Sequence, residues 1–309
     1  MIRTLLTALM TAATALLPST PAIPSYLPLE WHLTTIGAPQ AWAQGADGHG
    51  VHVLVIDTGE STATLTGTVT LLPGFTYNNA YPDNLDADGH GTFTVSEVAG
   101  HGPYWGVAPK ASVAMAQVVT TANGATDAAV AAAIRWGATR RFPVESISLG
   151  NPIDDPGVRA AVAFAERLGT VIVAAAGNDS GYGVNYPAAY PGVLCVAATD
   201  PWDQPASFTT ENEFVSLAAP GAWVFGLLPN RENSIQGRGL ATLPGTSMSA
   251  PLVAGAVADL ISVGLSPQQA KEAVLAGART VPNDEPQAYG HGILWLPGAL
   301  HYARERHWL

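Results

Sequence analysis

Four polar side chains, Asp57, His90, Asn178 and Ser247, stand in contexts where they could carry out chemistry. Ser247 follows Gly-Thr at the start of "GTSMSAPLVAGAVADLIS", whose apolar composition predicts a buried helix. A hydroxyl there could simply cap that helix, in which case nothing else in the chain would have to match it. If it is instead a nucleophile, it needs a general base, a group that orients the base, and a donor for an oxyanion.

The other three residues have contexts that suit those roles. Asp57 ends the apolar run "VHVLVIDTG", where a carboxylate could accept a hydrogen bond from an imidazole. His90 follows a glycine turn in "DGHGT", at the expected start of a helix whose dipole favours the neutral ring. Asn178 closes "TVIVAAAGN" and carries an amide that could donate to an oxyanion. Each residue taken singly is typical of an ordinary turn or surface, so the prediction depends on all four together.

Segments typical of strands and of helices alternate around these residues. The strand-like runs are buried and rich in β-branched residues, which is typical of a parallel sheet covered on both faces. We therefore predict a three-layer α/β/α fold with a mostly parallel central sheet, in which sites lie at the carboxyl ends of the strands. The predicted strands lie within 50–59, 146–150, 170–177, 193–200 and 214–221, and the predicted helices within 125–141, 156–169, 246–262 and 265–278.

Composition excludes several classes of partner. The chain has 309 residues, of which 48% are hydrophobic and 12% are charged. It therefore has enough apolar residues to build a large core. Its net charge is −11 and it has no basic cluster, so we expect no nucleic acid partner and no attraction to an anionic membrane. The single cysteine, Cys195, rules out an intrachain disulfide, and no Cys/His spacing predicts a metal site.

The first 22 residues predict a secretory signal peptide. Arg3 precedes an apolar stretch from Leu5 to Leu17, and small residues follow up to Ala22. An N-terminal membrane anchor is the alternative, but the stretch is short for a bilayer span. We therefore predict residues 1–22 as a signal peptide and 23–309 as one domain of a secreted, extracellular protein that is monomeric and has no membrane anchor.

The four motifs, taken in order, closely resemble the subtilisin family of serine proteases (the subtilases). "VIDTG" resembles the aspartate motif of the family, "DGHGT" its histidine motif, "AAAGN" its oxyanion motif and "GTSMSAP" its serine motif. The resemblance implies a serine endopeptidase that cleaves polypeptide substrates without a cofactor for the chemistry. It implies that Ser247 attacks the peptide carbonyl, His90 is the general base, Asp57 orients the base, and Asn178 stabilises the oxyanion.

The resemblance also implies where substrate binds. "SISLG" is similar to the edge strand against which the family pairs an extended substrate, and it also forms one wall of the pocket for the residue before the cut. The opposite wall is implied at 175–177, the pocket floor at Asn185 and its mouth at Asp179, so we expect the pocket to accept polar or basic residues. A cis peptide bond is implied at Tyr186-Pro187. The implied substrate-binding residues are Ser148, Leu149, Gly150, Ala175, Ala176, Gly177 and Asn185.

The helix after His90 and the N-terminal region depart from the family pattern. Phe93, Thr94, Ser96 and Glu97 replace the usual histidine and small residues, and Glu97 either belongs to a solvated face or perturbs His90. No folding-assistant prodomain is evident after residue 22, so we expect the domain to fold unaided or to be inhibited in trans. Pro251 is expected to be tolerated in the first turn of its helix.

The chain also departs from the family pattern at a calcium-binding turn. The turn after Asp57 lacks the carboxylate that the family often uses as a calcium ligand. A structural calcium site elsewhere is possible, although acidic residues in loops are more often simply solvated. The acidic residues considered for such a site are Asp83, Asp86, Asp88, Asp154 and Asp155.

Three alternatives to an active serine protease remain at this stage. The first is a catalytically inactive subtilase that binds peptides or acts as a scaffold. The second is a carboxyl-type relative that works in acid, against which His90 argues. The third is an α/β-hydrolase esterase, which is disfavoured because no Gly-x-Ser-x-Gly elbow surrounds Ser247.

Overall fold

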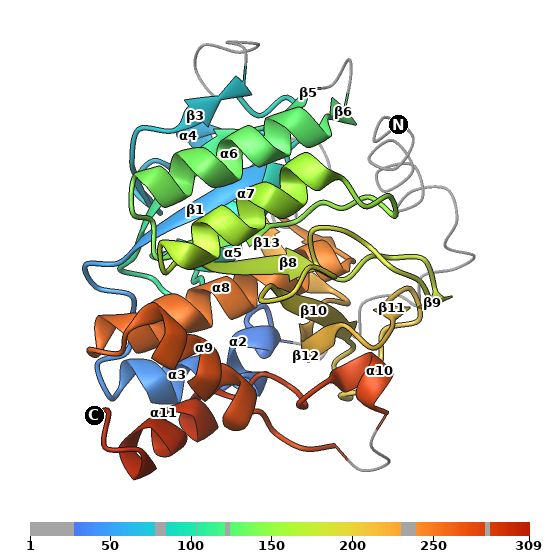
Figure 1. Cartoon of the computed structure of the whole chain (residues 1–309). Coiled ribbons are helices and arrows are strands. Elements are labelled where there is room, and N and C mark those ends of the chain that lie inside the picture. The colour runs from blue at the N-terminus through green and yellow to red at the C-terminus, as the bar shows by residue number, and fades with distance from the viewer. Residues whose placement is uncertain (1–27, 78–84, 103, 121–123, 230–238, 282–284) are drawn as a thin grey trace.

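The computed structural model describes residues 28–77, 85–102, 104–120, 124–229, 239–281 and 285–309. The predicted signal peptide lies outside these residues. Strands and helices alternate along much of the chain (Figure 1). The strands are β1 (His52–Asp57), β2 (Thr70–Leu71), β3 (Phe75–Thr76), β4 (Ser112–Gln117), β5 (Val119–Thr120), β6 (Gly124–Ala125), β7 (Val144–Ile147), β8 (Val171–Ala175), β9 (Gly181–Tyr182), β10 (Leu194–Thr199), β11 (Thr210–Glu211), β12 (Val215–Pro220), β13 (Val224–Leu227) and β14 (Leu240–Leu243). The helices are α2 (Trp31–Thr35), α3 (Ala38–Trp42), α4 (Thr62–Leu65), α5 (His90–Ala99), α6 (Asp127–Thr139), α7 (Pro156–Arg167), α8 (Thr246–Ser262), α9 (Pro267–Ala276), α10 (Pro286–Tyr289) and α11 (Leu296–Glu305).

One parallel sheet forms the centre of the molecule. Its strands run in the order β12-β10-β8-β7-β1-β4-β2, with β3 also paired to β4. Each of these pairs is parallel; in β1, for example, Val53 pairs with Val113 of β4 and with Val144 of β7. The carboxyl ends of β1, β7 and β8 therefore meet at one edge of the sheet, where the candidate residues begin.

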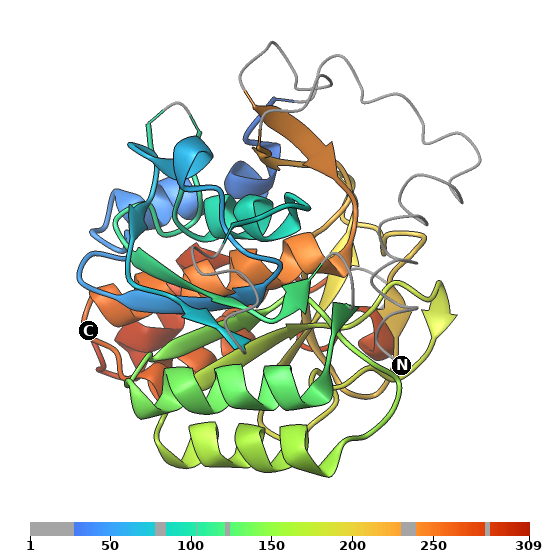
Figure 2. The same ribbon diagram turned by 90° about the horizontal axis from the view of Figure 1, so that it is seen from above.

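Helices cover both faces of this sheet, as predicted. Figure 2 shows α6 and α7 on one face and α5 and α8 on the other. The side chains of β1 alternate accordingly: Val53 and Val55 pack in the core with α5 and α8, whereas Leu54 and Ile56 pack in the core with α6 and α7. The structure is thus the three-layer α/β/α fold that the sequence predicts.

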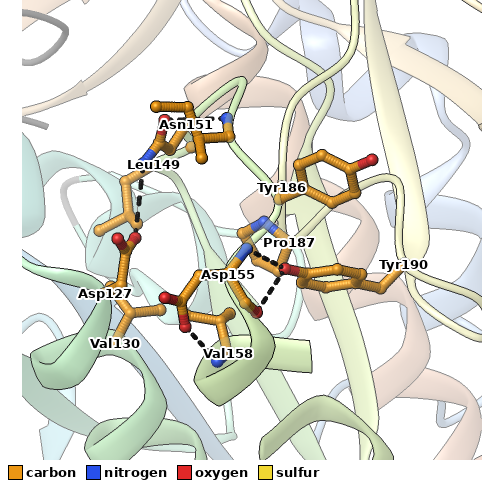
Figure 3. A pocket seen from close by; sticks show the side chains of 11 residues that line it. Asp127, Val130, Leu149, Asn151, Asp155, Val158, Tyr186, Pro187 and Tyr190 are labelled. Carbon is orange, nitrogen blue, oxygen red and sulfur yellow. Dashed lines mark hydrogen bonds between the residues drawn. The ribbon is translucent and has the colours of Figure 1, made fainter. Parts of the chain in front are cut away.

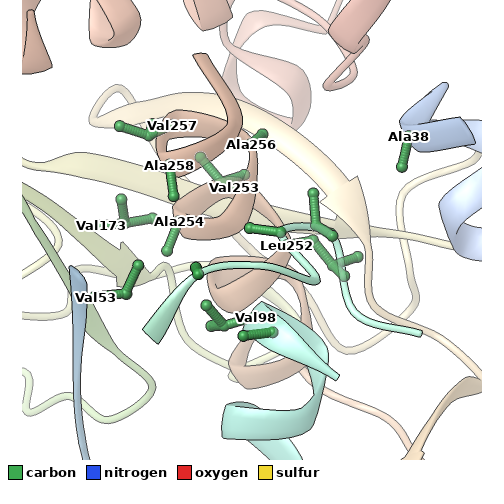
Figure 4. Close-up of a cluster of buried hydrophobic side chains, with 14 of the residues drawn as sticks. Ala38, Val53, Val98, Val173, Leu252, Val253, Ala254, Ala256, Val257 and Ala258 are labelled. Atoms are coloured by element: carbon green, nitrogen blue, oxygen red, sulfur yellow. The ribbon is translucent and has the colours of Figure 1, made fainter. Parts of the chain in front are cut away.

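The helix that begins beside Ser247 lies in the middle of the core. Every residue of α8 from Thr246 to Leu260 is buried, because the helix, apart from Asp259, is apolar or small on all sides. Figure 4 shows Val253 and Ala254 of α8 among side chains from the sheet and from α5. Burial of each Val, Leu or Met side chain of α8 contributes about 1.5–3 kcal/mol, so α8 provides a stable base for the residue at its start.

Other helices begin at the caps that their sequences specify. Asp155 accepts a hydrogen bond from Gly157 N at 2.8 Å and so caps α7, and Pro156 follows as its first residue. Ser266 and Gln269 form a complete capping box at the start of α9. None of the helices in the described part of the chain is both long and apolar enough to cross a membrane.

The structure differs from the sequence predictions at β7, and it contains elements that the sequence did not predict, including β4 next to β1. The segment 146–150 was predicted as an edge strand, but β7 ends at Ile147 and lies in the middle of the sheet between β1 and β8. Residues 148–150 instead continue past the carboxyl edge of the sheet, because Ser148 turns toward α8 and hydrogen-bonds there. The antiparallel hairpin β13–β14 was not predicted at all.

Candidate active site

Asp57 and His90 form a hydrogen-bonded pair at the carboxyl end of β1. Asp57 is the last residue of the strand and His90 the first residue of α5. His90 Nδ1 lies 2.7 Å from Asp57 Oδ1, and both side chains are buried. Since Nδ1 donates to the carboxylate, Nε2 is the acceptor nitrogen of the neutral ring and is free to take a proton.

A second carboxylate, Asp86, joins the end of β1 to the start of α5. Its Oδ1 accepts a hydrogen bond from Thr58 Oγ1 at 3.0 Å, and its Oδ2 accepts one from Thr92 N at 2.8 Å. Thr58 Oγ1 in turn accepts a hydrogen bond from Gly91 N at 2.8 Å. The turn after β1 and the first turn of α5 are therefore one hydrogen-bonded unit, which fixes the imidazole relative to its carboxylate.

Negative charge around His90 raises its pKa. Burial alone would lower the pKa of the imidazole, but the charge and hydrogen bond of Asp57 and the charges of Asp88 and Asp86 outweigh burial. The pKa of His90 is therefore raised above its ordinary value. The dipole of α5, which is expected to favour the neutral ring, does not prevent this rise.

Ser247 lies in the first turn of α8 and is linked to Ser148 by two hydrogen bonds. Ser247 Oγ donates to the Ser148 carbonyl at 3.2 Å, and Ser148 Oγ donates to the Ser247 carbonyl at 2.8 Å. No hydrogen bond joins Ser247 Oγ to His90, both of which are described residues. Such bonds are often long or poorly aligned without substrate and form in the substrate complex.

Pro251 leaves the Ser247 carbonyl available to Ser148. In an α-helix this carbonyl would accept a hydrogen bond from the N–H of residue 251, which proline lacks. The prediction that Pro251 lies in the first turn is wrong, since α8 begins at Thr246 and Pro251 lies inside it. The proline thus leaves one helical hydrogen bond unmade at the carbonyl to which Ser148, just past the end of β7, donates.

Asn178 and the start of α8 surround a common space. Asn178 Oδ1 accepts hydrogen bonds from Thr246 N at 2.9 Å and from Thr246 Oγ1 at 3.0 Å. This fixes the orientation of the amide, so that Nδ2 points away from Thr246. A methyl group built on Gly245 would lie 3.4 Å from Asn178 Nδ2 and 3.6 Å from Ser247 N. Asn178 Nδ2 and Ser247 N therefore both lie close to the space beside Gly245, at the positive end of the α8 dipole.

The residues predicted to bind substrate lie in two segments with Asn185 between them. Residues 148–150 follow β7, and residues 175–177 end β8 and continue beyond it. A methyl group on Gly177 would overlap the Asn185 amide, and one on Gly150 would lie 3.4 Å from Asn185 Cβ. Asn185 Nδ2 donates to the Ala176 carbonyl at 3.1 Å and to Asp179 Oδ2 at 3.0 Å. The Tyr186-Pro187 peptide bond, close to Asn185 in the chain, is cis as predicted.

A pocket opens beside Leu149. Figure 3 shows Leu149, Val130 and Pro187 around it, with the Asp127 carboxylate among these apolar side chains. Asn151 Nδ2 donates to Asp127 Oδ1 at 3.4 Å. Tyr190 lies at the far side, where its hydroxyl accepts a hydrogen bond from Asp155 N at 3.0 Å. The pocket is thus mainly apolar and has two carboxylates, of which that of Asp155 caps α7.

The acidic residues considered for calcium are poor ligands as they stand. Asp86 uses both carboxylate oxygens for protein donors, and Asp155 caps α7. Asp154 forms an ion pair, and Asp88 accepts a hydrogen bond from the backbone N–H of residue 90 at 3.2 Å. Asp83 lies outside the described residues. Within the described ranges, no three His, Cys, Asp or Glu side chains are grouped so that they could hold a metal ion.

Two supporting residues were not recognised from the sequence. Thr94 Oγ1 donates to Asp57 Oδ2 at 3.2 Å, so this departure from the family pattern contacts the carboxylate directly. Thr246 fixes the Asn178 amide. The sequence carried one signal for both residues, since each is a hydroxyl residue among the buried residues of a helix, Thr94 in α5 and Thr246 at the start of α8. Glu97 does not belong to a solvated face, as one prediction had it: it is fully buried, where it contacts Tyr104 and His32.

Comparison with known proteins shows which family this chain resembles in sequence and in structure. The model of the subtilase family matches residues 48–292. Thermitase of Thermoactinomyces vulgaris is 34% identical over 287 residues, which cover 91% of this chain and 97% of thermitase. Subtilisin Savinase of Lederbergia lenta is 32% identical over 234 residues, covering 74% of this chain and 82% of its own sequence. The crystal structure of MycP1 without its N-terminal propeptide has a TM-score of 0.77 and 27% identity, covering 87% of this chain and 96% of that one.

Proposed function

The chain belongs to the subtilase family and is a serine endopeptidase, and from that premise we propose that Ser247, His90 and Asp57 are its catalytic triad. Ser247 Oγ attacks the carbonyl carbon of the peptide bond to be cut, and His90 Nε2 takes the hydroxyl proton. The collapse of the tetrahedral intermediate breaks the C–N bond, and His90 returns the proton to the leaving amine. Water then attacks the acyl-enzyme by the same route and releases the acid.

The single observation that carries this proposal is that the Asp57–His90 pair and the start of α8 both lie at the carboxyl edge of the sheet, the pair at the end of β1 and Ser247 beside Ser148, which follows β7. The Asp57–His90 pair is held 2.7 Å apart at the end of β1, which fixes the tautomer that a general base requires. The closeness of Asn178 Nδ2 and Ser247 N to the space beside Gly245 supports an oxyanion site next to the nucleophile. In the proposed reaction the carbonyl oxygen becomes negative in that space, where two donors and the α8 dipole stabilise it.

The first step of the proposed reaction is a change of hydrogen-bond partner. Ser247 Oγ donates to the Ser148 carbonyl in the free protein. Pairing of a substrate strand with residues 148–150 would bring the scissile carbonyl beside Ser247, and rotation about the Ser247 χ1 angle would direct its hydroxyl to His90. The cost is one neutral hydrogen bond, about 0.5–1.5 kcal/mol, which the bond to His90 offsets.

A fluorophosphonate probe tests the proposal, because it reacts with an activated serine and leaves an inactive one untouched. We expect intact-mass spectrometry to show one covalent adduct on the folded protein, and peptide mapping to assign it to Ser247. The variants Ser247→Ala and His90→Ala should give no adduct, whereas Ser249→Ala, which changes the next serine of α8, should label normally. A folded wild-type protein that takes up no probe at neutral pH would support an inactive, peptide-binding subtilase instead.

We propose that the pocket between residues 148–150 and 175–177 prefers polar or basic residues before the cut. Asn185 Nδ2 donates hydrogen bonds to the Ala176 carbonyl and to Asp179, so Oδ1 is the Asn185 atom that can accept a hydrogen bond from a donor on the substrate. The Asp179 carboxylate lies at the same site and favours a positive charge. Cleavage rates of matched peptides that end in Phe, Leu, Gln or Arg before the cut will test this, and a strong preference for Phe would refute it.

We propose that the Leu149 pocket holds a second substrate side chain. It adjoins the segment along which the substrate strand is expected to run, and its apolar wall would hold the aliphatic part of that side chain. The Asp127 carboxylate would favour a basic tip. In a peptide library, Asp127→Asn should reduce selection of Lys and Arg at a single substrate position that is not adjacent to the cleaved bond. The preference at the position directly before the cleaved bond should stay unchanged.

We further propose that the protein is exported and acts as a monomer. The export proposal rests on the sequence pattern of residues 1–22, and the monomer is the expectation stated from the sequence. N-terminal sequencing of the protein from the culture medium of its host should give a start at Ile23. The proposed reaction uses only protein groups, so we expect a chelator to leave kcat unchanged.

A further inference from the structure

The hairpin β13–β14 connects the two halves of the candidate site. Its second strand, β14, ends at Leu243 and leads through Gly245 into α8 and Ser247. Its first strand, β13, packs against α5, the helix that begins with His90. The hairpin is therefore the covalent support of the nucleophile and a packing partner of the helix that carries the base.

Two of the residues that depart from the family pattern on α5 contact this hairpin directly. Ser96 Oγ accepts a hydrogen bond from Leu227 N at 3.0 Å. The Phe93 ring lies on Gly226, where a methyl group would come within 2.6 Å of the ring. Because only glycine allows this approach, β13 and α5 are in unusually close contact at that point.

A third departure, Glu97, reaches the hairpin through Tyr104. The Tyr104 hydroxyl is hydrogen-bonded both to Glu97 Oε1 and to the Phe225 carbonyl of β13. All three groups are buried, so water does not compete for these bonds. Phe225 is paired with Thr242 of β14, which places this contact one short strand away from the nucleophile.

The positions of the protons in this network can be worked out from the donors available. The Phe225 carbonyl can only accept, so Tyr104 gives its single proton to that carbonyl. Glu97 Oε1 must then carry a proton and donate it to the Tyr104 oxygen. Burial raises the pKa of Glu97 well above its ordinary value, which agrees with a protonated acid. His32, whose pKa burial lowers to about 3, is neutral and faces the pair with Nε2 3.3 Å from the Tyr104 hydroxyl.

We infer that Ser96, Glu97 and Tyr104 are positioning residues for catalysis: they hold β13–β14 against α5 and so set the distance between His90 and Ser247. The inference rests on the proposed function of those two residues. It assigns a role to side chains that contact neither substrate nor the reacting atoms. It also accounts for three polar or bulky residues on a helix where the family pattern has small ones.

A change in this contact should affect catalysis more than binding. Residues 148–150 and Asn185, which are proposed to bind substrate, do not take part in the contact between α5 and the hairpin. A shift of α5 relative to α8 would instead lengthen the path from Ser247 Oγ to His90 Nε2. A misplacement of about 1 Å by a mutation outside the reacting groups can reduce the rate by about 10²-fold.

The test compares variants that remove a hydrogen bond with variants that keep it. Tyr104→Phe removes the link to Phe225 and Glu97→Leu removes the donor to the Tyr104 oxygen, whereas Glu97→Gln keeps a neutral donor for that oxygen. Tyr289→Phe is the matched control, since Tyr289 is a buried tyrosine that donates to the Asp203 carbonyl at 2.8 Å in the core on the other side of the sheet. Rates are divided by the active-site concentration from fluorophosphonate titration and measured well below each Tm.

We expect Tyr104→Phe and Glu97→Leu to lower kcat by about 10- to 100-fold at unchanged KM, with an unchanged pH profile. Glu97→Gln should retain kcat, and Tyr289→Phe should lower only Tm. The inference is overturned if Tyr104→Phe and Glu97→Leu lower Tm but keep wild-type kcat, or if Glu97→Gln is as slow as Glu97→Leu. A wild-type protein that does not react with the probe would instead overturn the proposed function.

Discussion

His90 meets opposite requirements from folding and from catalysis. Its pKa is raised, so the folded state binds its proton more tightly than the unfolded chain does. The stabilisation from this pair is complete below the ordinary pKa of histidine and is lost as pH rises through the pKa of the folded state. The proposed reaction, however, needs the neutral ring. The enzyme should therefore become active over the pH range in which this contribution to stability is being lost.

The acid limb of kcat/KM should report the pKa of His90. We expect activity to rise with pH around a midpoint above 6.5, the ordinary histidine value. Asp88→Asn keeps an oxygen for the backbone N–H of residue 90 but removes one of the charges that raise the pKa, so the midpoint should move to lower pH. Asp47→Asn, at the opposite edge of the sheet, serves as the control. An unmoved midpoint in Asp88→Asn would contradict this account of the pKa.

Asn178 should contribute to the transition state and little to substrate binding. In subtilisin, a relative in the same family, removal of the corresponding kind of donor reduces kcat by about 10²–10³-fold, and we expect a loss of that order for Asn178→Ala. KM should change little, because the oxyanion exists only during reaction. Thr246→Val, which removes one of the two bonds that orient the amide, should have a smaller effect on kcat. Steady-state kinetics on one peptide will separate the two parameters.

At the scale of elements, the nucleophile depends on a contact between a strand end and an interrupted helix. The Ser247 carbonyl has no helical partner because of Pro251, and Ser148 Oγ replaces that partner at 2.8 Å. The contact holds α8 against the end of β7, beside the segment proposed to bind substrate. It shows how a residue that weakens a helix can strengthen the contact of that helix with a sheet.

A double-mutant cycle at Ser148 and Pro251 tests this contact. Ser148→Ala should lower the free energy of unfolding by about 1–3 kcal/mol, the cost of a buried carbonyl without a partner. In a Pro251→Ala background the helix N–H is restored, so the same substitution should cost less. Urea unfolding of proteins that also carry Ser247→Ala, to prevent self-digestion, gives the four values. Equal costs of Ser148→Ala in both backgrounds would show that the two residues are independent.

At the scale of the whole molecule, buried acids influence the response to pH. Glu145 of β7 is fully buried, and neither of its carboxylate oxygens has a hydrogen-bond partner among the described residues. It fits only because α6 has Gly137 opposite, where a methyl group would lie 2.5 Å from Oε1. Burial raises the pKa of Glu145 well above its ordinary value. Stability from this group is therefore full below the ordinary glutamate pKa and is lost as pH rises.

Replacement of Glu145 should stabilise the protein, and more so at higher pH. At neutral pH we expect Glu145→Met to raise the free energy of unfolding by about 1–3 kcal/mol, since a buried polar group without partners is removed. The gain should shrink toward acid pH, where the native carboxyl is protonated in both states. Urea unfolding at several pH values, again with Ser247→Ala, measures this, and the exposed Glu305→Gln is the control. A gain that does not vary with pH would contradict a raised pKa.

The sequence predicted the layers of the fold and the four central residues because both leave local patterns. Continuous apolar runs marked the buried strands, and each candidate residue followed such a run or preceded a helix. Contacts between distant segments leave no such pattern. The link of Tyr104 to Phe225, the donation from Thr94 to Asp57 and the burial of Glu97 depend on how α5, β1 and the hairpin pack together. Likewise, the sequence could not show that β7 stops at Ile147, since the next residue is redirected by a helix about a hundred positions later.

The central claim, that Asp57, His90, Asn178 and Ser247 act on one carbonyl group, is tested most directly by a crystal structure of the fluorophosphonate adduct. The account predicts the phosphonyl oxygen at about 2.7–3.1 Å from both Asn178 Nδ2 and Ser247 N, with His90 Nε2 within hydrogen-bond reach of Ser247 Oγ. An adduct whose oxygen points to solvent, with His90 still bound to Asp57 but out of reach of Ser247, would contradict it.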